Sequence, residues 1–185
     1  MQNFTEQFER AKFAVSILQA AGYDAHLVGG ALRVLAFGGV TNDIDIAVIV
    51  DGVSEAQLLH ADMDIVLDKL GYNFRLKHQS DYNNATAFLA DWREEFINII
   101  AYDKQYVTDI NDLVNHFDLN INSILMVDGE LRSSVIDIKN PVVLANPFVE
   151  SKAGRLRKER VERFKVEYSH LDWSQYDDSQ KHTSD

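Results

Sequence analysis

The sequence predicts an α+β fold in which helices alternate with short strands. Apolar residues recur at intervals of three and four over residues 4–21, as in an amphipathic helix, whereas residues 44–50 form a β-branched apolar run typical of a central strand. The 185 residues are 46% apolar and include two prolines and no cysteine. This composition predicts one domain with a substantial core, and it excludes disulfides, thiolate zinc sites and a cysteine nucleophile.

The first half of the chain predicts three helices and several strands. Two pairs at capping-box spacing, Asn3 with Glu6 and Ser54 with Gln57, mark helix starts. The expected elements are a helix at 4–21, a strand at 25–28, a helix at 31–37 ended by the glycines at 38–39, a strand at 44–50, a helix from 54 to 70 and a strand at 72–78.

The second half predicts mainly strands before a final helix. In the strand expected at 95–102, Asn98 lies on one face and Ile97 and Ile99 lie on the other. Thr108 is expected to cap a short helix that ends at His116. The remaining expectations are a strand at 86–92, a hairpin at 123–137 around Asp128-Gly129, a basic helix at 150–168 and a polar tail.

The net charge of −11 argues against a protein that coats nucleic acid, because a phosphate backbone must be met by clustered Lys and Arg. Residues 152–165 form one such cluster, with seven Lys or Arg against two Glu. This helix would attract a phosphate-bearing ligand, although a solvated helix with charges paired at i, i+4 is the alternative. A signal peptide and an apolar run of about 18 residues are both absent, so we expect a soluble cytoplasmic protein without membrane contact.

Asp43 and Asp45 are the first candidates for chemistry. Side chains two apart on a strand face the same side, about 6.6 Å apart, so the two carboxylates can share hard cations such as Mg²⁺. Asp62 and Asp64 provide a contrast, because on a helix residues two apart point about 200° away from each other. We interpret that second pair, and His60 beside it, as surface residues.

The glycine pair Gly29-Gly30 lies at the expected start of a helix. Glycines there let backbone N–H groups approach phosphate oxygens, where the helix dipole favours negative charge. Arg33 lies on the first turn of the same helix and can add a fork of donors to the same phosphates. Either motif alone is weak evidence, whereas the two in this order and on these elements are far more specific.

Four segments together resemble the head domain of the class II tRNA nucleotidyltransferase and bacterial poly(A) polymerase family. They span residues 25–165 in the family's order. The matching segments are Leu27-Val-Gly-Gly-Ala-Leu-Arg33, Asp43-Ile-Asp-Ile46, His116-Phe-Asp-Leu-Asn-Ile-Asn-Ser123, and a helix that carries Arg157, Arg160, Arg163 and Phe164.

This resemblance implies a polymerase-β-like nucleotidyltransferase fold, a small mixed sheet with helices packed on one side. Residues 1–148 would form the head, 149–170 a truncated basic neck helix and 171–185 a polar, flexible tail. The implied activity is Mg²⁺-dependent transfer of NMP from an NTP, ATP or CTP, to a hydroxyl on RNA such as tRNA, with release of pyrophosphate. Mn²⁺ is the alternative metal.

The resemblance also assigns roles to individual residues. Asp43 and Asp45 would hold the catalytic metals, and one of them would help to deprotonate the acceptor. The nucleotide-binding residues would be Gly29, Gly30 and Arg33 on the triphosphate, Asp118 and Asn122 at the ribose and the surrounding loop, and Arg157 and Arg160 on the nucleotide or its phosphates.

Several departures from the family's pattern limit these expectations. Asn98 stands where the family tends to carry a carboxylate that faces the metals, so we expect a weaker second metal site, with Glu94 or Asp103 as candidate substitutes. His116 and Phe117 replace two arginines. The base-selecting helix and the helical body that grips tRNA have no counterpart, so a protein partner or a second copy of the chain is the candidate source of that grip.

Two other functions remain open at this point. One is a catalytically silent head that binds nucleotide or RNA, or that serves a partner protein. The other keeps nucleotidyl transfer but changes the acceptor to a protein or a small molecule.

Overall fold

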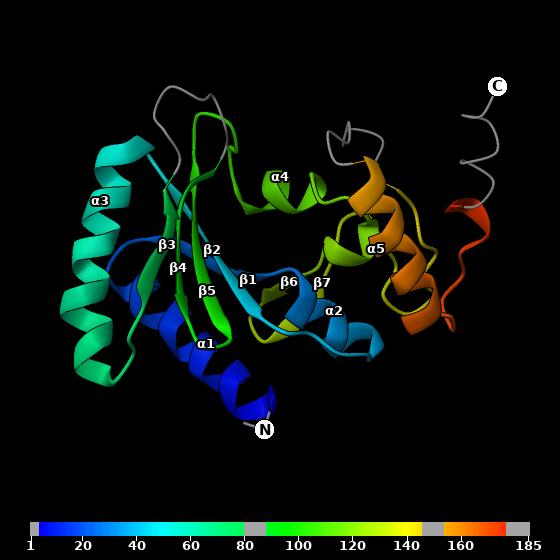
Figure 1. Ribbon diagram of the computed structural model, residues 1–185, viewed down its shortest axis with the longest axis horizontal. Coiled ribbons are helices and arrows are strands. Elements are labelled where there is room, and N and C mark those ends of the chain that lie inside the picture. The colour runs from blue at the N-terminus through cyan, green and yellow to red at the C-terminus, as the bar shows by residue number, and fades with distance from the viewer. Residues whose placement is uncertain (1–3, 80–87, 146–153, 177–185) are drawn as a thin grey trace.

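A five-stranded mixed sheet forms the centre of the computed structural model, which describes residues 4–79, 88–145 and 154–176 (Figure 1). In spatial order the strands are β1 (Asp24–Val28), β2 (Ile44–Val50), β5 (Ile97–Asp103), β4 (Phe88–Glu94) and β3 (Arg75–Gln79). Strands β2 and β5 are parallel, and the other neighbours are antiparallel. The sheet confirms the α+β prediction, with strand β2 at the bounds expected from its apolar run.

Helices cover both faces of the sheet (Figure 1). Helix α1 (Phe4–Ala20) and helix α3 (Gly52–Asp62) pack on the face that carries Ile46, Val48 and Ile99, where the larger core lies. The short helix α4 (Ile110–Asn115) covers part of the other face through a smaller core. The resemblance had implied helices on one side, and α4 adds a second layer that leaves the rest of its face available for a site.

Helix α3 begins two residues earlier than its predicted cap. The carboxylate of Glu55 accepts a hydrogen bond from the backbone N–H of Asp51, so the Ser54 and Gln57 capping box is wrong. Helical structure continues through the π-helical turn η1 (Met63–Leu67) and the 3₁₀ turn η2 (Asp68–Leu70). It ends at Gly71, in the left-handed conformation, as the sequence predicts.

Local turn chemistry shifts two further boundaries. Glu95 has φ of 46°, which turns the chain between β4 and β5 and delays the start of β5 to Ile97. The side chain of Asp109, and not that of Thr108, caps α4 by accepting from the N–H of Asp112 at 2.9 Å. The predicted hairpin is confirmed as β6 (Leu125–Val127) and β7 (Glu130–Arg132).

Helix α5 (Gly154–Glu167) is the basic helix that the sequence predicts, and its side chains are described from Glu159 on. Val161, Phe164 and the following Tyr168 are buried in the larger core, so one face of this helix packs against the rest of the fold and is not solvated. Residues 146–153, where the predicted helix starts, lie outside the described residues.

The chain beyond α5 folds back onto the head. Leu171 and Trp173 are 7% and 8% exposed, and the indole N–H of Trp173 donates to the carbonyl of Tyr168 at 3.0 Å. Asp172 forms a β-bridge with Val142. The predicted polar tail therefore does not include residues 171–176, because two large apolar side chains in that stretch find space in the core. Residues 177–185 lie outside the described residues.

Helix α2 (Gly30–Phe37) is joined to β2 by a loop that lies beside the end of α5 (Figure 1). The N–H of Val40 donates to Glu167 Oε1 at 2.9 Å. A Cβ added to Gly39 would lie 2.6 Å from Glu167 Oε1 and 2.7 Å from Tyr168 Oη, whereas a Cβ on Gly38 would meet no atom within 4 Å. Both glycines have positive φ, so the two positions differ chiefly in packing.

Substitution Gly39→Ala is therefore expected to destabilise the protein by about 1–3 kcal/mol more than Gly38→Ala. Both variants carry the backbone strain of a non-glycine residue at positive φ, and only the first forces the loop away from α5. Urea unfolding of the two variants measures the difference. Equal losses in the free energy of unfolding would contradict the tight packing of this loop.

Within the described part of the chain, no helix combines the length and the apolar character needed to span a bilayer.

Candidate active site

The turn between β1 and α2 brings a helix start against the aspartate strand. Val28, the last residue of β1, is the register partner of Asp45 in β2. Gly29 caps α2 with φ of 75°, and a Cβ at this position would lie 3.2 Å from Asp45 Oδ2. A Cβ on Gly30 would lie 2.8 Å from Thr41 Oγ1. The absence of a side chain at both glycines thus lets the backbone lie close to Asp45 and Thr41. The N–H groups of the first turn of α2, which have no partner within the helix, lie beside the aspartates.

Asp43 and Asp45 lie at the start of β2, as the sequence predicts. The hydroxyl of Thr41 donates to the backbone carbonyl of Asp43 at 2.9 Å. In the parallel partner strand, Asn98 is the register partner of Asp45, and its amide Nδ2 donates to Asp45 Oδ1 at 2.8 Å. The loop therefore fixes the backbone at Asp43, and the neighbouring strand fixes the carboxylate of Asp45.

Burial raises the pKa of Asp45 to about 6. The hydrogen bond from Asn98 opposes this shift, and the negative charge of Asp43 adds to it. Arg93 on β4 and Arg160 on α5 are close enough to lower the same pKa. Ionising a desolvated carboxylate beside a second carboxylate is unfavourable, and a bound cation would reduce this cost.

The aspartate pair fits one hard divalent cation. The described residues contain no group of three or more His, Asp or Glu side chains arranged for a metal ion. Mg²⁺ in nucleotide sites is commonly bound by one or two carboxylates together with substrate phosphates, and this donor set matches that pattern. Asp43 and Asp45 would hold the ion, which would supply charge neutralisation at the phosphates.

The two candidate substitutes for a third carboxylate do not reach the aspartate pair. Glu94 binds Arg10 of α1 at 2.8 Å, on the opposite face of the sheet. Asp103 is the register partner of Val50 at the far end of β2. Both expectations are therefore wrong, because side chains alternate between the faces of a strand and Asn98 occupies the only position in β5 directly beside Asp45.

Arg33 is only 5% exposed and joins α2 to α5. Its Nε donates to the hydroxyl of Tyr168 at 3.0 Å, and its Nη1 donates to Oδ1 of Asn122. Its guanidinium carbon lies 4.3 Å from the ring centroid of Phe164. Nη2 lies 3.5 Å from the Cβ that a residue at position 30 would have, so this end of the fork faces the glycine turn. Its role on the triphosphate stays a prediction.

Asp118 and Asn122 form one polar unit with Arg33. Asp118 Oδ1 accepts from the N–H of Leu119 at 3.0 Å and from Asn122 Nδ2 at 2.9 Å. Arg160 Nη1 lies 3.5 Å from Asp118 Oδ2. The segment between them includes the buried 3₁₀ turn η3 (Asn120–Asn122). Its nucleotide contacts stay a prediction, and the side chain of Arg157 lies outside the described residues.

Two adjoining hollows meet at Gly30, Asp45 and Arg160. One, of about 330 Å³, also contacts Asp118 and Asn122, and the other reaches Arg33 and Asp43. The structure therefore brings together all the predicted site residues whose side chains it describes. These residues are Gly29, Gly30, Arg33, Asp43, Asp45, Asp118, Asn122 and Arg160.

Three residues at the site were not singled out from the sequence. Tyr102 lines the first hollow, where burial and the charges of Asp45 and Asp91 raise its pKa to about 12. Tyr168 holds Arg33, and its spacing of four residues from Phe164 on a helix is the signal that could have found it. His116 lines the first hollow from the end of α4.

A mixed sheet, a glycine turn at a helix start and paired strand aspartates define the class of polymerase-β-like nucleotidyltransferase domains. The family model described as "Poly A polymerase head domain" matches residues 25–142. The chain belongs to this family.

Curated relatives are CCA-adding enzymes. The enzyme of Ligilactobacillus salivarius (strain UCC118) is 25% identical over 171 residues, which cover 89% of this chain and 41% of the relative. The enzyme of Lactiplantibacillus plantarum (strain ATCC BAA-793 / NCIMB 8826 / WCFS1) is 26% identical over 126 residues, which cover 68% of this chain and 30% of the relative. The chain thus spans less than half the length of these relatives.

Solved structures show the same fold. The Thermotoga maritima CCA-adding enzyme complexed with tRNA matches with a TM-score of 0.58 and 18% identity, covering 86% of this chain and 37% of that one. A complex of CCA-adding enzyme with ATP matches with a TM-score of 0.60 and 16% identity, covering 92% and 41%.

Proposed function

We propose that this chain is a divalent-metal-dependent nucleotidyltransferase that moves NMP from an NTP, ATP or CTP, to a hydroxyl on an RNA 3′ end and releases pyrophosphate. The convergence of a glycine-capped helix start, two strand aspartates and Arg160 on one hollow carries this proposal. The CCA-adding relatives support it, and one of their solved structures is titled as a complex with tRNA and another as a complex with ATP.

Each group at the site has a task in this reaction. The N–H groups at the start of α2 bind triphosphate oxygens, with Arg160 and the Nη2 end of Arg33 beside them. Asp43 and Asp45 would hold a divalent cation, which would supply charge neutralisation at the phosphates. The acceptor oxygen attacks the α-phosphorus, the bond from that phosphorus to the bridging oxygen breaks, and pyrophosphate leaves with the electron pair. Catalysis is then positioning plus charge stabilisation.

The acceptor class is supported by the relatives, which are named CCA-adding enzymes, and by the solved structure titled as a complex with tRNA. This chain matches less than half of the length of these relatives, and we propose that a partner protein or a second copy of the chain contributes to RNA binding. The exposed cationic end of Arg160, 47% exposed, is a contact that such an RNA can share.

The test is incorporation of labelled NTPs into tRNA and short RNAs with Mg²⁺, comparing the wild type with the Asp43→Ala/Asp45→Ala double variant. The expected result is a loss of at least about 10³-fold in the variant. Asp64→Ala, which removes an exposed aspartate on a helical turn, is the control and should retain activity, and Asp62 is left in place because it accepts from the hydroxyl of Tyr23 at 2.6 Å. Equal incorporation by the wild type and the Asp43/Asp45 variant would disprove the proposal.

The hydrogen bond from Asn98 to Asp45 favours a second candidate, a head that binds nucleotide without turnover. That candidate predicts a rise in Tm with NTP and no incorporation under any condition tested. Incorporation that depends on Asp43 and Asp45 excludes it.

A further inference from the structure

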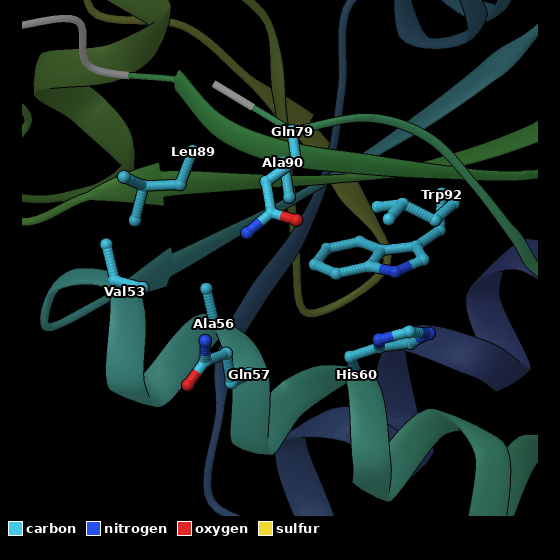
Figure 2. A pocket seen from close by; sticks show the side chains of 9 residues that line it. Val53, Ala56, Gln57, His60, Gln79, Leu89, Ala90 and Trp92 are labelled. Atoms are coloured by element: carbon cyan, nitrogen blue, oxygen red, sulfur yellow. The ribbon is translucent and has the colours of Figure 1, made fainter. Parts of the chain in front are cut away.

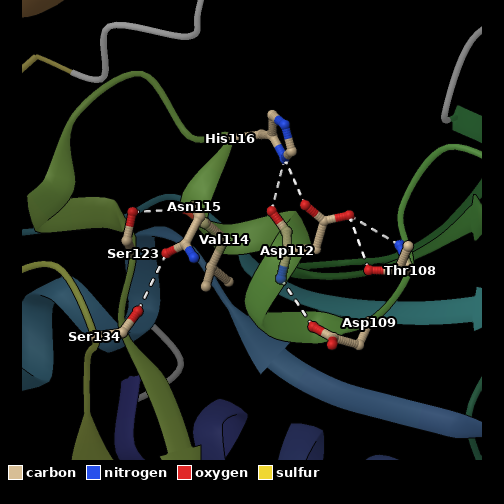
Figure 3. A network of polar contacts seen from close by, with 8 residues as sticks. All are labelled: Thr108, Asp109, Asp112, Val114, Asn115, His116, Ser123 and Ser134. Carbon is tan, nitrogen blue, oxygen red and sulfur yellow. Dashed lines mark hydrogen bonds and ion pairs between the residues drawn. The ribbon is translucent and has the colours of Figure 1, made fainter.

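His116 lies at the end of α4, on the rim of the hollow that holds Asp45. Its side chain is 55% exposed, and it lines that hollow together with Gly29, Asp118 and Arg160. Helix α4 is anchored beside the site, because the hydroxyl of Ser123 donates to the carbonyl of Val114 at 2.6 Å (Figure 3). The imidazole therefore projects from a fixed helix end toward open space next to the proposed chemistry.

One ring nitrogen of His116 is committed to its own helix. Nδ1 lies 2.7 Å from the backbone carbonyl of Asp112 and 3.4 Å from Asp112 Oδ1 (Figure 3). A carbonyl only accepts, so Nδ1 carries the hydrogen. Asp112 is itself held, since its carboxylate accepts from the N–H of Thr108 at 2.9 Å and its own N–H donates to Asp109. With its hydrogen on Nδ1, the ring has its lone pair on Nε2, and the side chain lines the hollow.

The other titratable groups that line this hollow are already engaged. Asp45 Oδ1 accepts from Asn98, and Oδ2 lies beside Gly29, where the proposed cation binds. Asp118 Oδ1 accepts two hydrogen bonds, and Oδ2 faces Arg160. Tyr102 stays protonated near neutral pH because burial raises its pKa to about 12. Among the described lining residues, Nε2 of His116 is the uncommitted proton acceptor.

We propose that His116 is the general base that activates the acceptor hydroxyl in this site, a role that rests on the proposed nucleotidyl transfer. Nε2 takes the hydroxyl proton as the acceptor oxygen bonds to the α-phosphorus, and pyrophosphate leaves with the electrons of the broken phosphorus–oxygen bond. The proton then passes from Nε2 to water. His116 thereby takes the task that the sequence had assigned to one of the two aspartates, whose oxygens are needed for the cation.

The test compares His116→Gln with the wild type in single-turnover incorporation. Glutamine keeps a similar size and polarity but cannot take up a proton at this pH, so we expect a fall of about 10²–10⁴-fold in the rate of the chemical step. Nucleotide affinity, measured separately by titration, should change by less than about threefold, because the base contacts the acceptor and not the NTP.

His60→Gln is the matched control. His60 also lies four residues from an aspartate, with Nε2 3.8 Å from Asp64 Oδ2, but it lines a separate hollow of about 300 Å³ between α3 and β4, next to Trp92 (Figure 2). This hollow is on the other face of the sheet from Asp45. The variant should incorporate nucleotide like the wild type.

Chemical rescue separates a base from a structural residue. In the smaller variant His116→Ala, added imidazole should restore the rate, with more basic imidazoles rescuing better. Wild-type rates in His116→Gln, a change confined to nucleotide affinity, or no rescue of His116→Ala would each overturn the assignment while nucleotidyl transfer stands. If the wild type incorporates no nucleotide with any acceptor, the proposed function fails and the assignment fails with it.

Discussion

Asp45→Asn is expected to abolish nucleotide incorporation and at the same time to stabilise the protein. The carboxylate is required for the cation, so activity should fall by at least about 10³-fold. Stability should rise because burial raises the pKa of Asp45 from 3.8 to about 6, which makes its ionised form unfavourable in the folded state at neutral pH. Asparagine has a similar shape, removes the charge and keeps an acceptor for the amide of Asn98.

The sign of the pH dependence follows from this raised pKa. Well below pH 3.8 both the folded and the unfolded forms bind the proton, so the wild type and the variant should be about equally stable there. Between pH 3.8 and about 6 the unfolded wild type has lost this proton while the folded wild type keeps it, so the wild type loses stability as pH rises through this range. Above pH 6 the difference levels off, and the variant should be more stable than the wild type by up to about 3 kcal/mol at pH 7. Urea unfolding without divalent cations at pH 4.5 and pH 7 measures the difference.

The exposed Asp64 supplies the control for this prediction. Its side chain is 67% exposed, so Asp64→Asn should change the free energy of unfolding by less than about 0.5 kcal/mol at either pH. Adding Mg²⁺ should narrow the gap by stabilising the wild type and not Asp45→Asn. A variant that is less stable than the wild type at pH 7 would contradict the unfavourable burial of this carboxylate.

Arg33→Ala is expected to cost about 3–5 kcal/mol of stability and to loosen α5. The change leaves the hydroxyl of Tyr168 and Oδ1 of Asn122 without their donor, and it empties the space over the ring of Phe164. Arg33→Lys should recover less than half of the loss, since one ammonium cannot span both acceptors and stack on the ring. Urea unfolding gives the size, and hydrogen exchange of the α5 amides gives the location.

Arg75→Ala is the matched control for Arg33→Ala. Arg75 lies exposed on the edge strand β3, so its removal should cost less than about 0.5 kcal/mol and leave exchange in α5 unchanged. If Arg33→Ala unfolds at the same urea concentration as the wild type, Arg33 does not hold α5 to the head.

Much of the fold was predictable because its elements obey local rules. The apolar run at 44–50 became β2, the glycine at 71 ended a helix, and the Asp128-Gly129 turn formed its hairpin. Helix starts were harder, because several polar side chains near a start compete for the same few N–H groups. At the start of α4, for example, the side chain of Asp109 caps the helix and that of Thr108 does not. The strand order was not predicted, since local patterns do not specify which strands pair and the family resemblance implied only a small mixed sheet.

The candidate site also contains residues that local sequence patterns predict and residues that only tertiary packing brings together. The glycine pair and the two aspartates were visible because each motif is contiguous and its chemistry depends on strand and helix period. The partners of Arg33 were not visible, because Tyr168 lies 135 residues away and only tertiary packing joins them. His116 was noted only as a departure from the family, although Asp112 lies four residues before it.

The contact between Arg33 and Tyr168 also sets an order on folding during synthesis. Arg33 emerges early, but the hydroxyl and the ring that accept its guanidinium follow 135 residues later. At about 5–20 residues per second, the ribosome needs roughly 7–27 s to deliver them. Before Phe164 and Tyr168 have been synthesised, the guanidinium of Arg33 lacks the ring and the hydroxyl that cover it in the folded protein. The guanidinium therefore stays hydrated in the nascent chain. The turn between β1 and α2 is therefore completed only after α5, near the end of the described residues, has been synthesised.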